Sequence, residues 1–359
     1  MRRSCVLAVV VAAALACAAV PASAEPLALS TVPANVPIAA HGGWVVWSTP
    51  AAGGGWGLSV WHDGQTTAPP LAHRQEPFDV DVGTDANGRA VATFSRCTTA
   101  PTTYLGRLQA WTGAGCHLRV VDLATGRERA ASAPRPAGAS DTTPSMWRGR
   151  IAFARRDRRH KDVAQVLLWS PSTHRVTTLR HGRVPTDCPY KSCKGMPVRG
   201  AVQGLDLGTR LATFLWWVEA PGALGWEVRA DRLDNGRSVL TGTGYLDEAC
   251  TGGTDTLAPS TPTADGDQVW YSRLASACYV DTASLVRFDA RTGRAAFGAV
   301  PGEVLRFAKD GDALYALVAP KPPDKVGPAC DAPGAPCTIE RIDTPALVPR
   351  PYAPHQPFF

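Results

Sequence analysis

The stretch TADGDQVWYSR (263–273), followed by TASLVRFDARTG (282–293) and RAAFGAV (294–300), decides the fold of this chain. A polar Asp-Gly turn leads into an apolar run, a second run ends in a Thr-Gly turn, and a third run follows at once. β-branched and aromatic residues favour strands, while Asp and Gly favour tight turns. The stretch therefore predicts an antiparallel meander, with an inner strand just before it in TLAPSTP (256–262).

The same pattern recurs six times along the chain, without a helical periodicity between the copies. DLATGR (122–127) and DARTGR (289–294) are near-copies of one turn. Repetition of short strands at this period is typical of a β-propeller. We therefore predict an all-β fold, a six-bladed β-propeller of four-stranded antiparallel blades, with five or seven blades as alternatives. The glycines of the first turn of each copy are Gly43, Gly88, Gly149, Gly208, Gly266 and Gly311.

The blade pattern, a D-G turn, an aromatic-rich strand and then D-x-x-T-G, resembles the TolB-like, PD40-type six-bladed propellers of secreted bacterial proteins. The resemblance covers residues 36–350 and implies a closed ring. It implies no particular activity, because propellers of this kind bind proteins, bind sugars or carry enzyme sites. We expect the N-terminal segment 25–35, with PLALSTV at 26–32, to supply the outer strand of the last blade; ALVPR (346–350) is the alternative, and 351–359 is a tail.

The first 24 residues have the features of a secretory signal peptide. Arg2 and Arg3 precede an apolar run at 6–20, and small residues lead to a cleavage site after Ala24. The run is short for a membrane span, which needs roughly 20 residues. The residues before Cys17 match a lipidation motif poorly, which argues against a lipoprotein. We therefore predict a secreted, extracellular protein without a transmembrane segment.

The charge balance is mildly basic. The chain has 37 Lys and Arg against 31 Asp and Glu, a net charge of +6. Cleavage after residue 24 removes two arginines and no acid, which leaves +4. These charges are spread along the chain, so we expect no nucleic-acid partner. We also expect a monomer.

Cysteine usage agrees with export. Eight cysteines follow the signal peptide, an even number that suits an oxidising compartment. We expect each to pair with its neighbour in sequence, although other pairings remain open. There is no CxxC and no histidine pair close to a cysteine pair, so we expect no metal site. Each expected bridge lies in a long connection between second and third strands or between blades, which predicts disulfide-stapled loops on one face. The expected pairs are Cys97–Cys116, Cys188–Cys193, Cys250–Cys278 and Cys330–Cys337.

Binding residues are expected on this stapled face, because loops held on a rigid scaffold commonly carry binding sites. Arginines recur at the loop end of the second strand of three blades, as Arg96, Arg155 and Arg273. A planar guanidinium suits carboxylates or phosphates. The alternative is salt bridging between blades, for instance to Asp141, Asp247 or Glu248.

Aromatic side chains give a second set of candidate contacts. Trp56, Tyr104 and Trp111 fall in expected loops and are candidates for ligand contact, whereas strand tryptophans such as Trp47 and Trp216 are expected in the core.

The innermost strands line the central channel of a propeller, and several polar residues fall in them. Asp79 and Asp81 lie in FDVDVG, Asp206 in GLDLG and His41 in AHGG. Opposed carboxylates in a channel could hold a calcium ion or act as an acid/base pair. They could equally be hydrogen-bonded groups that fix the turns.

No common catalytic motif is present: no nucleophile elbow, zinc-protease helix, phosphate loop or EF-hand loop. We therefore predict an exported binding or scaffold module at the cell envelope or outside the cell, with a protein or glycan ligand and no cofactor. One alternative is a secreted hydrolase or lyase that uses Asp79, Asp81, Asp206 and His41 at the channel mouth. Another is a passive structural protein of the envelope.

Overall fold

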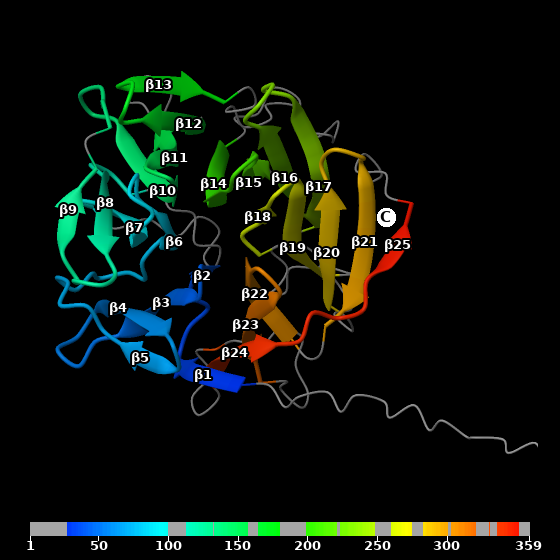
Figure 1. Ribbon diagram of the computed structural model, residues 1–359, viewed down its shortest axis with the longest axis horizontal. Helices are drawn as coiled ribbons and strands as arrows, with labels where there is room; N and C mark the ends of the chain where they lie inside the picture. The colour runs from blue at the N-terminus through cyan, green and yellow to red at the C-terminus, as the bar shows by residue number, and fades with distance from the viewer. Residues whose placement is uncertain are drawn as a thin grey trace, which may run out of the picture.

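The chain folds into a ring of six β-sheets around a central axis (Figure 1). The computed structural model describes residues 27–99, 113–131, 133–156, 164–179, 199–220, 223–247, 260–274, 283–300, 303–320, 330 and 336–351. Each sheet is antiparallel and has four strands, apart from one with five. The all-β six-bladed propeller is confirmed. Among the described residues no helix has the length and hydropathy to cross a membrane.

The blades follow one another in sequence order, and each runs from an inner strand at the axis to an outer strand at the rim. Blade 1 contains β2 (Ile38–His41), β3 (Trp44–Pro50), β4 (Trp56–His62) and β5 (Gln65–Thr67). Blade 2 contains β6 (Asp81–Thr84), β7 (Ala90–Arg96), β8 (His117–Asp122) and β9 (Glu128–Ala130). Blade 3 contains β10 (Ser140–Trp147), β11 (Arg150–Arg156), β12 (Ala164–Ser170) and β13 (Arg175–Thr178).

The second half of the chain repeats this arrangement with longer strands in its first blade. Blade 4 contains β14 (Arg199–Leu207), β15 (Leu211–Ala220), β16 (Ala223–Arg232) and β17 (Ser238–Asp247). Blade 5 contains β18 (Thr263–Asp265), β19 (Gln268–Leu274), β20 (Ala283–Asp289), β21 (Arg294–Ala299) and β25 (Val348–Arg350). Blade 6 contains β22 (Glu303–Asp310), β23 (Ala313–Ala319), β24 (Cys337–Ile342) and β1 (Leu27–Val32).

The two ends of the chain take different places. β1 pairs antiparallel with β24 as the outermost strand of blade 6, so the N-terminal segment closes the ring. β25 instead pairs with β21 and adds a fifth, exposed strand to blade 5. Closure by β1 ties the first strand to the last blade through backbone hydrogen bonds and leaves no gap in the ring.

In each of the near-copied turns the aspartate accepts from the backbone N–H of the threonine three residues later, and its carbonyl accepts from the glycine N–H at 2.8 Å. Asp122 Oδ1 accepts from the backbone and hydroxyl of Thr125, both at 3.0 Å. Asp289 Oδ1 accepts from the backbone N–H groups of Arg291 and Thr292 at 2.9 and 2.8 Å. The glycine that ends each turn has a positive φ, which an L side chain resists. Asp and Gly are therefore required by the turn geometry, which explains the D-x-x-T-G repeat.

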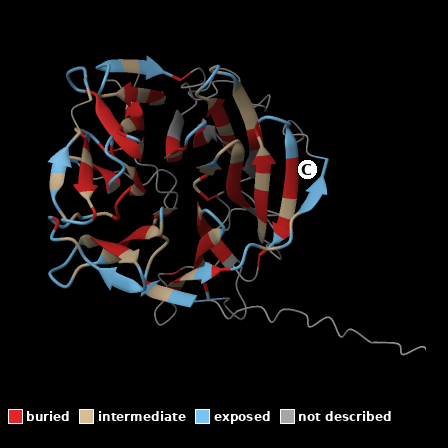
Figure 2. Ribbon diagram, viewed as in Figure 1, coloured by how far each residue is buried: buried red, intermediate tan, exposed pale blue. Residues whose placement is uncertain are grey.

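The hydrophobic core lies between neighbouring blades. Leu215 and Val228 of blade 4 pack against Val269 and Tyr271 of blade 5. Both faces of the central strands are consequently buried, as the red strands of Figure 2 show. Full burial of one large apolar side chain contributes about 1.5–3 kcal/mol. Three of the predicted core tryptophans are confirmed: Trp47 and Trp216 are fully buried and Trp270 nearly so. Trp44, for which burial was also predicted, is only half-buried and stacks on the His62 ring.

The inner strands approach one another closely. A Cβ at Gly83 of blade 2 would collide with the carbonyl oxygen of Met146 in blade 3, and a Cβ at Gly204 of blade 4 with the side chain of Thr261 before β18. These glycines therefore bring the inner strands together around the axis.

Two of the expected disulfides are confirmed. Cys97 and Cys116 are bonded, as are Cys330 and Cys337. The first bridge joins the end of β7 to the start of β8, so it closes the connection between second and third strands of blade 2. The second joins Cys330 to the first residue of β24, so it also lies in the connection between second and third strands, in blade 6. The other four cysteines lie outside the described residues: Cys188, Cys193, Cys250 and Cys278.

Candidate functional site

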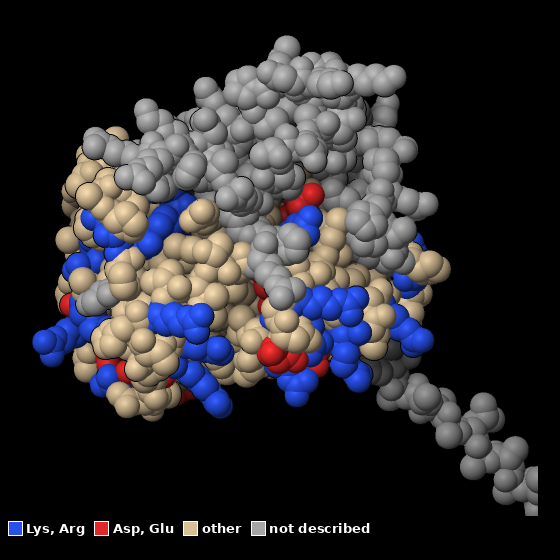
Figure 3. All heavy atoms as spheres, turned by 90° about the horizontal axis from the view of Figure 1, so that it is seen from above, with Lys and Arg blue, Asp and Glu red and all other residues tan. Residues whose placement is uncertain are grey.

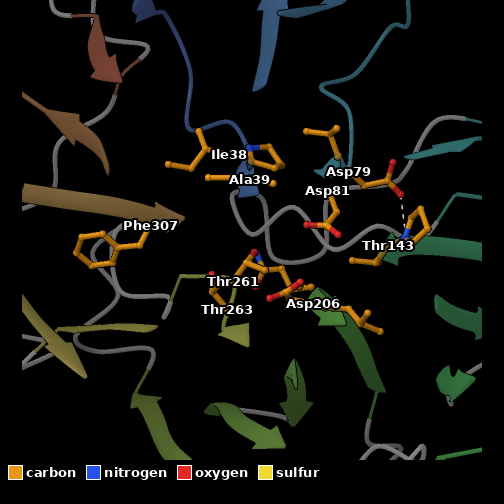
Figure 4. Close-up of a pocket in the computed structure, with 16 residues that line it drawn as sticks. Ile38, Ala39, Asp79, Asp81, Thr143, Asp206, Thr261, Thr263 and Phe307 are labelled. Carbon is orange, nitrogen blue, oxygen red and sulfur yellow. Dashed lines mark hydrogen bonds between the residues drawn. The ribbon is translucent and has the colours of Figure 1, made fainter. Parts of the chain in front are cut away.

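A small cavity lies on the axis of the propeller and is lined by inner segments of all six blades (Figure 4). Its volume is about 30 Å³. One water molecule needs roughly 10–15 Å³ of such volume. The cavity therefore has room for one or two waters or a monatomic ion, and it is far too small for a sugar ring.

Asp79 lies at the loop end of this cavity, and each of its carboxylate oxygens accepts two hydrogen bonds. Its Oδ1 accepts from the Ser95 N–H at 2.8 Å and from Arg74 Nη1 at 3.1 Å. Its Oδ2 accepts from the Ser95 hydroxyl at 2.5 Å and the Thr143 N–H at 2.9 Å, the latter drawn in Figure 4. This buried carboxylate therefore ties together the link before β6, strand β7 and the inner strand of blade 3.

Asp81 and Asp206 face each other deeper in the channel, and Figure 4 shows both carboxyl groups directed into the cavity. The Ser145 hydroxyl lies 3.4 Å from Asp206 Oδ1 and also contacts Asp81. Asp206 Oδ2 accepts from the Ala264 N–H at 2.6 Å. In contrast, Asp81 Oδ2 is buried and has no hydrogen-bond partner in the protein.

The surroundings of this pair disfavour two negative charges. Burial raises the pKa of Asp206 to about 6. The pKa of Asp81 is also well above its usual range, first because of burial and then because of the nearby Asp206 charge. Both residues border the cavity and are partly accessible.

His41, the fourth predicted channel residue, lies apart from the cavity. It follows the cavity-lining Ala40 at the tight-turn end of β2, where its ring meets that of Trp147 edge-on at 4.8 Å. Burial lowers the pKa of His41, and the charge of Asp310 partly opposes this shift. Asp310 itself accepts from the two glycine N–H groups of the β2–β3 turn. Three of the four predicted residues, Asp79, Asp81 and Asp206, therefore line one cavity, and His41 does not.

Arg96, at the end of β7, is held in place on three sides. Its Nε and Nη2 donate to the two oxygens of Glu128 at 2.8 and 2.7 Å, and its Nη1 donates to the Ala72 carbonyl at 3.1 Å. Its guanidinium also lies over the Phe94 ring. Arg119 donates to the same Glu128 at 2.6 Å. The two guanidiniums hold the pKa of Glu128 below its usual value, Arg96 having the larger effect.

Arg155 has the equivalent position in blade 3 but a different environment. It is buried and bonds Asp141 through Nε and Nη2 at 2.7 and 2.9 Å, and Nη2 also donates to the Pro134 carbonyl. Asp141 and Arg155 are directly opposite each other on β10 and β11. Asp141, one of the acids named in the salt-bridge alternative, is therefore a partner of an arginine, but the pair lies within one blade and not between blades, because antiparallel register brings these residues together. Arg273 lies in β19 opposite Ser284, but its side chain is outside the described atoms.

A larger pocket of about 280 Å³ lies at the stapled end of blades 1 and 2. It is formed by residues 73–76 of the link between these blades and by residues 96–98 after β7. His73 and Gln75 are exposed, whereas Arg74 is largely buried against Asp79 and over the Phe78 ring. The pocket thus brings two guanidiniums, Arg74 and Arg96, together beside the Cys97–Cys116 disulfide.

The predicted aromatic contacts are placed in part. Trp56 is the first residue of β4 rather than a loop residue, and the loop prediction was wrong. Its backbone exchanges hydrogen bonds of 2.7 and 2.9 Å with Arg74, and its half-buried ring packs against the core on both sides of blade 1. This pairing extends the strand by holding the link against blade 1. Tyr104 and Trp111 lie outside the described residues.

Sequence reasoning missed two residues that line the cavity, Thr143 and Gln203. Both lie at β-bulges of inner strands, where the register shifts between Thr142 and Ser145 and between Val202 and Gly204. The bulges depend on pairing with the next strand, which the local sequence does not specify. The only local signal was Pro144, since a proline inside a strand marks a bulge or an edge.

Charged side chains elsewhere on the described surface are dispersed. On the side seen in Figure 3, Lys and Arg form several separate groups with Asp and Glu among them. Among the described residues no group of three or more His, Cys, Asp or Glu side chains is arranged to hold a metal ion.

The sequence of this chain has no recognised relative in the two sequence comparisons. No protein-family model matches the chain, and no curated protein does. The TolB-like family assignment thus stays a prediction, although the propeller that it implied is confirmed.

Several solved structures resemble the fold at low identity. A puromycin-hydrolyzing peptidase of Mycobacterium tuberculosis is 14% identical over 88% of this chain and 53% of its own, with a TM-score of 0.41. The chain therefore spans about half of that peptidase. An oligogalacturonate lyase from Vibrio parahaemolyticus is 7% identical over 89% and 91%, with a TM-score of 0.43. The GH93 α-L-arabinofuranosidase of Fusarium graminearum is 9% identical over 89% and 98%, with a TM-score of 0.48. Such distant similarities carry no argument about activity.

Proposed function

We propose that this protein is an exported binding module, and that its ligand contacts the pocket formed by residues 73–76 and 96–98. The observation that carries the proposal is the size of this pocket beside that of the channel. About 280 Å³ can admit one sugar unit or one large side chain, whereas about 30 Å³ cannot. The disulfides fit an oxidising compartment and so support export.

Arg96 is the anchor in this proposal. Three of the five N–H donors of its guanidinium are engaged by Glu128 and Ala72, which leaves two for a ligand. Because Glu128 and Phe94 already fix the guanidinium, little side-chain conformational entropy is lost when a ligand binds it.

The local charge indicates the ligand chemistry. Arg96 and Arg119 share the single carboxylate of Glu128, so these three side chains have a net positive charge of one, while Glu76 is the acid on the pocket wall. A guanidinium donates two parallel hydrogen bonds to a carboxylate or phosphate. We therefore expect a ligand that presents a carboxylate, on a glycan or on a protein partner.

The chain offers a matched control for the test. Arg96→Ala and Arg119→Ala each remove one partner of Glu128, and the two side chains have similar exposure, 24% and 29%. Of Arg96 and Arg119, the first lines the pocket and the second does not. The protein and both variants, confirmed folded, serve as baits for envelope extract and culture fluid of the producing cell.

We expect a component that the wild type and Arg119→Ala retain and that Arg96→Ala loses. Equal loss in both variants would mean that only general charge matters. Retention by all three baits would place the ligand elsewhere and overturn the proposal.

A hydrolase or lyase is the second candidate, and the facing carboxylates of Asp81 and Asp206 are the observation in its favour. It requires a substrate group that reaches a cavity of about 30 Å³. Asp81→Asn should abolish turnover in that case and leave binding at the Arg96 pocket unchanged. A passive structural protein would be affected by neither change.

A further inference from the structure

We propose that the axial cavity binds one calcium ion, held by oxygen atoms of Asp81, Asp206, Thr143 and Gln203. The four residues come from the inner strands of blades 2, 3 and 4. This site is separate from the pocket at Arg96 and does not depend on the function proposed above.

Three oxygen atoms on the cavity wall have no hydrogen-bond partner in the protein: Asp81 Oδ2, Thr143 Oγ1 and Gln203 Oε1. Thr143 and Gln203 are only 6% and 4% exposed, so bulk water does not solvate them. A buried polar atom left without a partner costs about 1–3 kcal/mol. Three such atoms around one small cavity are explained together if a single species binds all of them.

The charge of the cavity indicates a cation. Asp81 and Asp206 supply two carboxylates, and none of the described residues that line the cavity is basic. Asp79, by contrast, has Arg74 as its counter-ion. Two desolvated carboxylates without a basic partner are unfavourable, and a divalent cation would neutralise both.

The backbone presents the two neutral ligands by local distortion. Thr143 has a φ of +51°, which a β-branched residue adopts only under constraint. It lies in the bulge of β10, and Gln203 is the extra residue in the bulge of β14. A bulge removes a residue from the strand pairing and redirects its side chain. Here the two bulges put a hydroxyl and an amide beside the same cavity.

The donor set favours calcium over magnesium. Calcium takes 6–8 oxygen ligands at about 2.3–2.6 Å and accepts carboxylates, side-chain amides and waters in irregular geometry. Magnesium demands an octahedron and retains several waters, which a cavity of about 30 Å³ has no room to hold. Bound calcium would link three blades at the axis, where the inner strands carry no disulfide among the described residues.

The test uses the full protein after removal of metals by a chelator. Calcium chloride is added, and thermal unfolding and isothermal titration calorimetry are measured. Calcium in large excess over its dissociation constant should raise Tm by about 3–6 °C with a stoichiometry near one. Magnesium at the same concentration should give a smaller shift. No heat and no shift with calcium would overturn the proposal, and a larger effect of magnesium would overturn the assignment to calcium.

Two variants locate the site, and one controls for charge. Asp81→Asn removes a ligand without changing shape, and Gln203→Leu removes the amide oxygen without touching either carboxylate. Both should fold and lose at least tenfold in calcium affinity. Asp63→Asn removes an acid that is 87% exposed, away from the cavity, and should bind as the wild type does. Calcium affinity that is unchanged in both cavity variants, or reduced equally in Asp63→Asn, would show that the ion binds elsewhere.

Discussion

Two aspartates of one short segment have very different hydrogen bonding: Asp79 at the loop end of the channel and Asp81 in its middle. Asp79 accepts four hydrogen bonds and pairs with Arg74. Asp81 has an oxygen without any partner and faces a second carboxylate, Asp206. Whether an acid in this channel has its hydrogen bonds satisfied therefore depends on the donors that neighbouring blades supply.

The cause lies in blade 3. At the loop end, the bulge of β10 turns the N–H of Thr143 toward Asp79. In the middle, the same bulge leaves the Thr143 hydroxyl without a partner. One distortion of an inner strand therefore supplies a donor to Asp79 and leaves a hydroxyl without a partner beside the cavity that Asp81 lines.

Asp79→Ala should have the largest effect on stability. It removes the acceptor of four donors and leaves Arg74, whose side chain is only 8% exposed, as a buried charge without its partner. Loss of one member of a buried pair costs about 3–5 kcal/mol. Urea unfolding should show this as a lower midpoint with an unchanged slope. A loss below about 1 kcal/mol would remove the distinction between the two regions.

Asp81→Asn should have a much smaller effect on stability when a chelator is present. The amide ends the repulsion with Asp206 and can donate to it, so the free energy of unfolding should stay within about 1 kcal/mol of the wild type or rise. The same urea series measures it. If Asp81→Asn destabilises the protein as much as Asp79→Ala, both acids stabilise the fold, and the unpartnered oxygen of Asp81 is not kept free for a ligand.

The ion pair at Arg96 should give the smallest effect, and one that depends on pH. Arg96 and Arg119 lower the pKa of Glu128 below its usual 4.5. A lowered carboxyl pKa stabilises the folded state above pH 4.5, and this contribution is lost as pH falls through the folded-state pKa. Arg96→Ala should therefore cost up to about 1 kcal/mol at pH 7 and progressively less below pH 4.5.

Unfolding midpoints from pH 3 to 7 measure this difference. The control is Arg155→Ala, whose partner is buried with it. It should cost more than Arg96→Ala at pH 7. Equal losses of stability would mean that the two ion pairs contribute equally to the free energy of unfolding, despite their different burial.

The positions of some candidate site residues could be predicted, because they follow from the local sequence pattern of each blade. The recurrence of Arg96 and Arg155 placed both at loop ends of second strands, where the structure has them. The assignment of FDVDVG to an innermost strand placed Asp79 and Asp81 at the axis, where both line the cavity. Their partners could not be predicted, because Thr143 and Glu128 come from other strands and approach only after the blades assemble.

The sequence by itself determined the architecture. Turn residues such as Asp289 and Gly293 set each hairpin through bonds within a few residues, and apolar strands between them require burial on both faces. Only the tertiary structure decided which polar groups are satisfied. Asp79, Asp81 and Asp206 are the same residue type on equivalent inner segments, and their differences arise from hydrogen bonds across blades and from how far each lies from solvent.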